Sequence, residues 1–254
     1  MTLRILFLSP HAPPTSSFGE LPGSTILVAM LIVLGAVFAL AVLPQMWVRR
    51  VIAEHAHDRQ DIPGTGGEFA RHLLDEMKLN HVQVEETNLG DHYDPEAKVI
   101  RLLPQHMNGR SLAAIVIAAH ETGHAMQDAT GYQPLQARTR LAKQAVRMEK
   151  VGAVVMLAAP IVMALAKAPH ILVIEVFAGV MIFAMTVLMH ATTLPVEFDA
   201  SFRRALPVLK AGGYISDADM PAARKILKAA AYTYVAAAAM SLLDVARWFR
   251  VLRM

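Results

Sequence analysis

His120, Glu121 and His124 form a His-Glu-x-x-His motif inside an apolar, alanine-rich stretch. Residues four apart lie on one face of an α-helix, so the two histidines can present ring nitrogens to one metal ion. Glu121 lies beside them, where its carboxylate can reach a metal-bound water. Zinc acidifies such a water, and the carboxylate can take its proton as the water attacks a carbonyl. The motif therefore predicts one Zn²⁺ per chain and Glu121 as a general base.

Any metal in this chain must be held by His, Asp or Glu, because the sequence has no cysteine. The alternative to a metal site is a buried helix whose two histidines are hydrogen-bonded by their neighbours. Three ionisable groups on one alanine-rich turn are costly to bury without a partner, which favours the metal.

A catalytic zinc needs a third protein ligand and an open fourth position. Glu197 is the preferred candidate, because a predicted helix over residues 195–209 places it in the first turn, where a carboxylate is favoured. It could instead serve only to stabilise that helix end. Asp199 is the second candidate, and about 200° around the helix separates the two, so they cannot face one metal together. The other side chains considered and set aside are Asp128, Glu149, Glu175 and His190.

The composition predicts a membrane protein, since 55% of the residues are hydrophobic, 18% are charged and the mean hydropathy is +0.39. A net charge of +3 is mild and does not indicate nucleic-acid binding. We therefore expect a lipid bilayer, and no nucleic acid, as a partner.

Apolar runs predict about three transmembrane helices. After a flexible leader at residues 1–23, residues 24–46 are expected to form an anchor and residues 151–190 a membrane hairpin. Basic residues flanking these runs predict a multi-pass protein of the cell membrane with its active site on the cytoplasmic side. A fourth span at residues 229–243 is an open alternative to a helix packed on the catalytic domain.

The remaining segments predict a zincin-like catalytic domain in two parts, residues 47–150 and 191–254. Its elements are a helix over residues 68–77, strands over residues 81–87 and 98–104 that form a β-hairpin, and a motif helix capped by Ser111. The expected fold is a mainly α-helical integral membrane protein carrying this domain.

Several longer stretches resemble the YugP-type family of neutral zinc metallopeptidases over about residues 64–254. They are residues 91–95, 108–111, 118–132, 194–201 and 229–236. The resemblance implies His120 and His124 as ligands, Glu121 as the catalytic base and Glu197 as the third ligand. More distantly, the chain resembles the HtpX-like membrane gluzincins, in which a membrane hairpin separates the motif from a ligand glutamate. Those proteins usually carry an aspartate four residues after the glutamate.

Ser201 occupies that aspartate position here, with Asp199 nearby, so either side chain is a candidate to orient a motif histidine. His92 and Tyr93 could donate a hydrogen bond to an oxyanion, or could simply belong to a turn. Arg204 could bind a substrate carboxylate, or could lie at the cytoplasmic membrane surface.

The sequence thus predicts a membrane-anchored zinc endopeptidase that cleaves peptides or proteins, membrane proteins among them. The alternative is a non-proteolytic membrane scaffold or regulatory protein that retains the metal site. Glu121 favours the enzyme, because a structural metal site does not need that acid.

Overall fold

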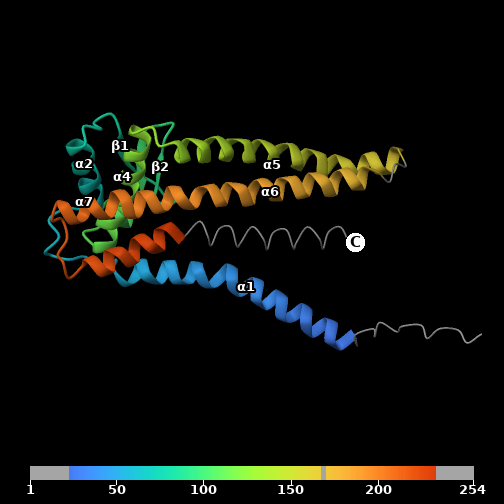
Figure 1. The fold of residues 1–254 in the computed structure, drawn as a ribbon, viewed down its shortest axis with the longest axis horizontal. Helices are drawn as coiled ribbons and strands as arrows, with labels where there is room; N and C mark the ends of the chain where they lie inside the picture. Colours follow the sequence, from blue (N-terminus) through green and yellow to red (C-terminus); the bar gives the residue numbers. More distant parts are fainter. Residues whose placement is uncertain (1–22, 167–169, 233–254) are drawn as a thin grey trace, which may run out of the picture. The chain divides into compact units, whose positions relative to one another are not determined.

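A computed structural model describes residues 23–166 and 170–232 of the chain (Figure 1). The chain divides into two compact units, Met1–Ala36 and Val37–Met254. The described part of the first unit is helical, and the motif residues belong to the second unit. The leader expected at residues 1–23 lies almost entirely outside the described residues.

The described chain is mainly helical. Its helices are α1 (Gly23–Glu54), α2 (Gly66–Glu76), α3 (Pro104–Met107), α4 (Leu112–Ala129), α5 (Gln133–Ala166), α6 (His170–Phe198), the π-helix η1 (Asp199–Ala205), α7 (Leu206–Ala211) and a helix over residues 220–232. Its strands are β1 (Gln83–Glu86), β2 (His92–Asp94) and β3 (Val99–Leu102).

The motif helix α4 forms as the sequence predicts. The Ser111 hydroxyl accepts a hydrogen bond from the backbone N–H of Ala114 at 3.1 Å and caps the helix. Most of α4 is buried, and its alanines let neighbouring elements approach closely. Helix α2 packs against α4 and begins with a capping box between Thr65 and Glu68. These two helices, with the sheet, α7 and residues 220–232, enclose the hydrophobic core.

The predicted β-hairpin is wrong in its pairing. Strand β1 pairs with β3 in parallel, and β3 pairs with β2 in antiparallel fashion, which gives the order β1-β3-β2. The segment predicted as a turn contains β2, and it supplies the antiparallel partner of β3. Alternating apolar residues indicate a strand, but they do not specify its neighbour or its direction.

Helices α5 and α6 lie side by side, and both extend beyond the hairpin expected at residues 151–190 (Figure 1). The helix predicted to begin near residue 195 does not begin there, because α6 continues through Pro195 to Phe198. The Thr193 hydroxyl donates to the carbonyl of Met189 one turn earlier, as a threonine side chain inside a continuous helix does.

Within residues 23–166 and 170–232, no helix has the length and apolar character needed to cross a membrane. This finding corrects the expected integral membrane fold, with its anchor at 24–46 and its hairpin, and the multi-pass membrane location with a cytoplasmic site. The apolar runs are parts of longer helices that continue into charged segments. Helix α1 runs on to Glu54, and α5 begins with a half that contains several basic residues. The proposed fourth span, residues 229–243, lies largely outside the described residues.

Candidate metal centre

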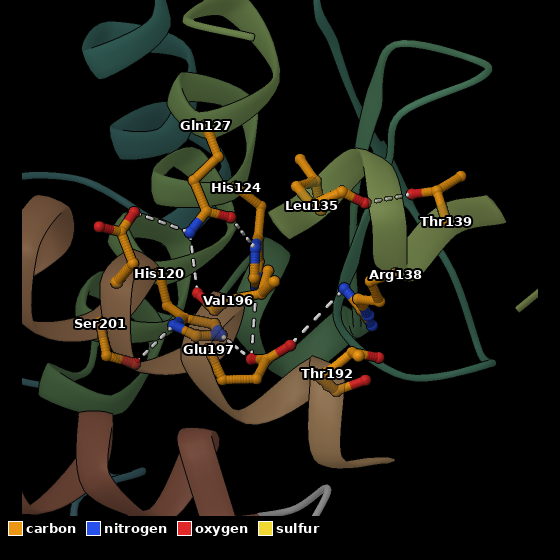
Figure 2. A network of polar contacts seen from close by, with 12 residues as sticks. His120, His124, Gln127, Leu135, Arg138, Thr139, Thr192, Val196, Glu197 and Ser201 are labelled. Atoms are coloured by element: carbon orange, nitrogen blue, oxygen red, sulfur yellow. Dashed lines mark hydrogen bonds and ion pairs between the residues drawn. The ribbon is translucent and has the colours of Figure 1, made fainter. Parts of the chain in front are cut away.

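His120, His124 and Glu197 lie together in the protein interior (Figure 2). Oε2 of Glu197 is 3.2 Å from Nε2 of His120 and 3.4 Å from Nε2 of His124. One potential ligand atom from each residue falls within 4.8 Å of the others. The residue preferred as the third ligand is therefore placed against both motif histidines.

Two elements build this cluster. Helix α4 carries both histidines, and the last turn of α6 carries Glu197. The π-helix that follows Glu197 passes so close to α4 that a Cβ atom at Gly123 would lie 2.7 Å from the carbonyl oxygen of Ala200. Gly123, inside the motif, is the residue that permits this approach.

Glu197 has the environment of a metal ligand. Its side chain is 0% exposed, and neither carboxylate oxygen has a hydrogen-bond partner among the residues that the structure describes. A buried carboxylate without hydrogen bonds is costly unless a cation compensates it. Two imidazole nitrogens and one carboxylate form a ligand set typical of catalytic zinc, so the residues present fit that ion.

The histidines influence the charge of Glu197. Burial by itself would raise the pKa of the Glu197 carboxyl, but the adjacent His124 and His120 rings, when they carry a positive charge, outweigh burial and hold that pKa below its usual value. Positive charge at this position therefore favours the ionised carboxylate, and a bound metal ion would supply such a charge when the rings are neutral. Arg138, from α5, reaches the other carboxylate oxygen, with Nη1 at 3.6 Å from Oε1 (Figure 2).

Glu121 is also buried, at 5% exposure. Burial raises the pKa of Glu121 to about 7, partly opposed by His120 and reinforced by the charges of Glu197 and Asp91. A carboxyl group with a pKa near neutrality can both accept and release a proton, which suits a general base.

Both motif histidines have a partner for their second ring nitrogen. Nδ1 of His120 lies 3.0 Å from the Ser201 hydroxyl, and Nδ1 of His124 lies 3.0 Å from Oε1 of Gln127. Such contacts hold each ring so that Nε2 faces Glu197.

Comparison with known proteins shows which family this chain belongs to. Residues 29–253 match the model of a family described as "Putative neutral zinc metallopeptidase". The chain belongs to this family. It is also 35% identical over 189 residues to the protein named "Putative membrane protease YugP" from Bacillus subtilis (strain 168), covering 74% of this chain and 80% of that protein. No solved structure matches the chain. The resemblance recognised from the sequence is confirmed, and the family description names the metal that the buried cluster fits.

In this member of the zinc metallopeptidase family, Asp199 does not join the cluster. Its Oδ2 accepts hydrogen bonds from Nε2 of Gln127 at 2.9 Å and from Nε of Arg204 at 2.8 Å. Asp199 therefore contacts His124 only indirectly, through Gln127. Arg204 is paired with Asp199 and lies over the ring of Tyr132.

His92 and Tyr93 lie in strand β2, and each has a hydrogen-bond partner in the structure. Nδ1 of His92 lies 2.8 Å from the Gly90 carbonyl, and the Tyr93 hydroxyl donates to Asp128 at 2.6 Å. Asp128 also pairs with Lys98.

Gln127 and Arg138 were not predicted from the sequence as site residues. Gln127 could have been found, because a residue three positions after His124 lies on the same helical face. Arg138 gave no local signal, because it contacts Glu197 across the packed helices α5 and α6.

Proposed function

We propose that this chain is a zinc-dependent endopeptidase in which His120, His124 and Glu197 hold the metal and Glu121 is the general base. The observation that carries the proposal is the buried Glu197 carboxylate, which faces Nε2 of both histidines and has no hydrogen-bond partner within the described part of the chain. Membership of a zinc metallopeptidase family supports the same reaction class.

Each protein group has a role that follows from its position. Zinc, when bound, would polarise a peptide carbonyl and acidify a water. The histidines and Glu197 provide two neutral donors and one negative charge, which leaves the metal a net positive charge. Glu121 takes the proton from the attacking water and passes it to the leaving amine. Its burial makes the carboxylate a stronger base than one in water.

Glu121→Gln is the direct test, with the purified full chain, metal analysis and a library of quenched fluorescent peptides. Glu121→Gln should retain one zinc per chain and lose hydrolysis by about 10²–10⁴-fold. Glu85→Gln, an exposed glutamate on β1, is the matched control and should cleave like the wild type.

Two results contradict the proposal. One is peptide cleavage that survives Glu121→Gln, and the other is purified protein that holds no zinc. The alternative, a non-proteolytic scaffold or regulatory protein, is favoured over the peptidase if His120→Ala unfolds the protein while Glu121→Gln leaves every measured property intact. Comparing the proteomes of cells with wild-type and Glu121→Gln protein would identify uncut substrates that accumulate.

A further inference from the structure

We propose that Gln127 and Ser201 are positioning residues that set the tautomers of the two motif histidines. Each accepts the Nδ1–H of one ring and so leaves that ring's Nε2 unprotonated and directed at Glu197. The inference rests on the metal site proposed above, but it concerns protons that can be observed without any catalysis.

The amide of Gln127 has only one orientation that satisfies its neighbours. One end of the amide lies 2.8 Å from the carbonyl oxygen of Val196 and 2.9 Å from Oδ2 of Asp199. Both neighbours are acceptors, so the amide atom between them must be the nitrogen. The amide oxygen therefore faces His124, and it can only accept a hydrogen bond. Hence Nδ1 of His124 carries the proton.

The pairing of Arg204 with Asp199 supports this orientation. Nε of Arg204 donates to Oδ2 of Asp199 at 2.8 Å, the same oxygen that accepts from Gln127. A carboxylate paired with arginine remains an acceptor and does not donate to the amide. Asp199 therefore orients the Gln127 amide, and Gln127 in turn contacts His124, so Asp199 is connected to the metal site without being a ligand.

Ser201 performs the equivalent task for His120 with a hydroxyl group. The hydroxyl donates its hydrogen to the carbonyl oxygen of Leu227, 3.3 Å away, an atom that can only accept. We infer that the hydroxyl oxygen, 3.0 Å from Nδ1 of His120, then accepts the N–H of that ring. Ser201 is fully buried, so water does not compete for this contact.

The opposite tautomer would harm metal binding. A ring with its proton on Nε2 would aim an N–H at Glu197 and satisfy the buried carboxylate by a hydrogen bond. That hydrogen bond would satisfy the three residues without a metal, and zinc would have to displace the Nε2 proton in order to bind. By holding the protons on Nδ1, Gln127 and Ser201 keep the carboxylate open to a cation.

The test is ¹⁵N NMR of the histidine rings in the metal-free full chain at about pH 9, well above the ordinary histidine pKa of about 6.5. In the wild type, the rings of His120 and His124 should carry their protons on Nδ1. Gln127→Met removes the amide at nearly constant volume and should move only the His124 proton towards Nε2. Ser201→Ala should move only the His120 proton, so each variant is the control for the other.

Zinc affinity is the second readout, measured by competition with a chelator. Each variant should bind zinc about 10–100-fold more weakly than the wild type. Gln127→Glu separates positioning from a merely structural role. Its carboxylate can still accept from His124 but cannot donate to Val196, so it should retain the Nδ1–H signal while lowering the melting temperature. If Gln127→Met does not fold, the wild-type and Gln127→Glu spectra still decide the question.

The proposal is overturned by a wild-type ring that carries its proton on Nε2, or on both nitrogens, at that pH. It is also overturned if Gln127→Met leaves the His124 signal unchanged and zinc affinity within about twofold, far less than such partners usually contribute. Failure of the proposed peptidase would show separately, as cleavage unaffected by Glu121→Gln. That result leaves the ring tautomers untouched.

Discussion

Nη1 of Arg138 lies 3.6 Å from Oε1 of Glu197, while the other oxygen of that carboxylate faces the two histidines (Figure 2). The side chain of Arg138 is 24% exposed and that of Glu197 is 0% exposed. The guanidinium group thus approaches the buried carboxylate from the more exposed side of the site. The Arg138 charge lies beside Oε1, and Oε2 is left to face the two histidines.

Arg138→Met should therefore weaken zinc binding by about tenfold, the lower end of the range for groups that orient a metal ligand. Arg138→Lys should recover part of the loss, because lysine supplies the charge without the planar fork of donors. Arg140→Met is the matched control, since Arg140 is exposed on the same helix and bonds to Gln136. Chelator competition measures all three, and equal affinities for wild type and Arg138→Met would refute the role.

Zinc removal should lower the thermal stability of the chain. Free zinc at about 1,000 times its dissociation constant adds about 4 kcal/mol to the free energy of unfolding, provided the unfolded chain binds none. Melting curves with zinc and with a chelator measure this shift. Glu197→Gln removes a ligand charge at constant size, and its melting temperature should not respond to zinc. A zinc-dependent shift of wild-type size in that variant would exclude Glu197 as a ligand.

Gly123→Ala should destabilise the protein and weaken zinc binding together. The added Cβ would meet the Ala200 carbonyl at 2.7 Å and push the π-helix away from α4. We expect a loss of about 1–3 kcal/mol in the free energy of unfolding, as for other overpacked sites. Gly179→Ala is the control, because nothing lies within 4 Å of a Cβ there and alanine favours helix. Urea unfolding and zinc titration would show both effects, and a Gly123→Ala protein as stable as the control would contradict the packing argument.

Asp219 should contribute stability that disappears in acid. The hydrogen bond from Arg59 holds the pKa of Asp219 below its usual value, against the effect of burial. A carboxyl with a lowered folded-state pKa stabilises the fold above its unfolded pKa of about 3.9, and this contribution is lost as the pH falls through the folded-state pKa. Asp219→Asn should therefore cost about 1 kcal/mol at neutral pH, at the upper end for a partly exposed ion pair.

The measurement is the free energy of unfolding of wild type and Asp219→Asn from neutral pH downwards. The difference between them should shrink below about pH 4. Asp61 also pairs with Arg59, but its side chain is 64% exposed, so Asp61→Asn should have the smaller effect. A difference between wild type and Asp219→Asn that stays constant down to the lowest pH would show that the ion pair is not its source.

Local features of the site were predictable from the sequence. The spacing of His120 and His124 places two rings on one helical face, and Ser111 begins that helix as predicted. Both are decided within a few residues by the helical repeat and by a capping hydrogen bond. Family membership was likewise readable from the motifs and is confirmed.

The tertiary structure decided which distant groups meet. Glu197 was preferred from the sequence, but it lies in the last turn of α6 and not in the first turn of a new helix. Thr193 and Pro195 look like a helix start, yet packing carries α6 through them. The strand pairing of β3 and the transmembrane prediction for the apolar runs were wrong for the same reason. Strand pairing and helix length depend on neighbouring elements that no local sequence pattern specifies.

The amino-acid sequence by itself thus determined which chemical groups are available: two imidazoles, a neighbouring carboxylate base and a further acid that can serve as the third metal ligand. Only the fold decided that Gln127 and Ser201 would hold the rings and that Arg138 would reach Glu197. Hydrogen bonds between residues far apart in the sequence exist only once the helices have packed, because their geometry depends on the relative positions of whole elements.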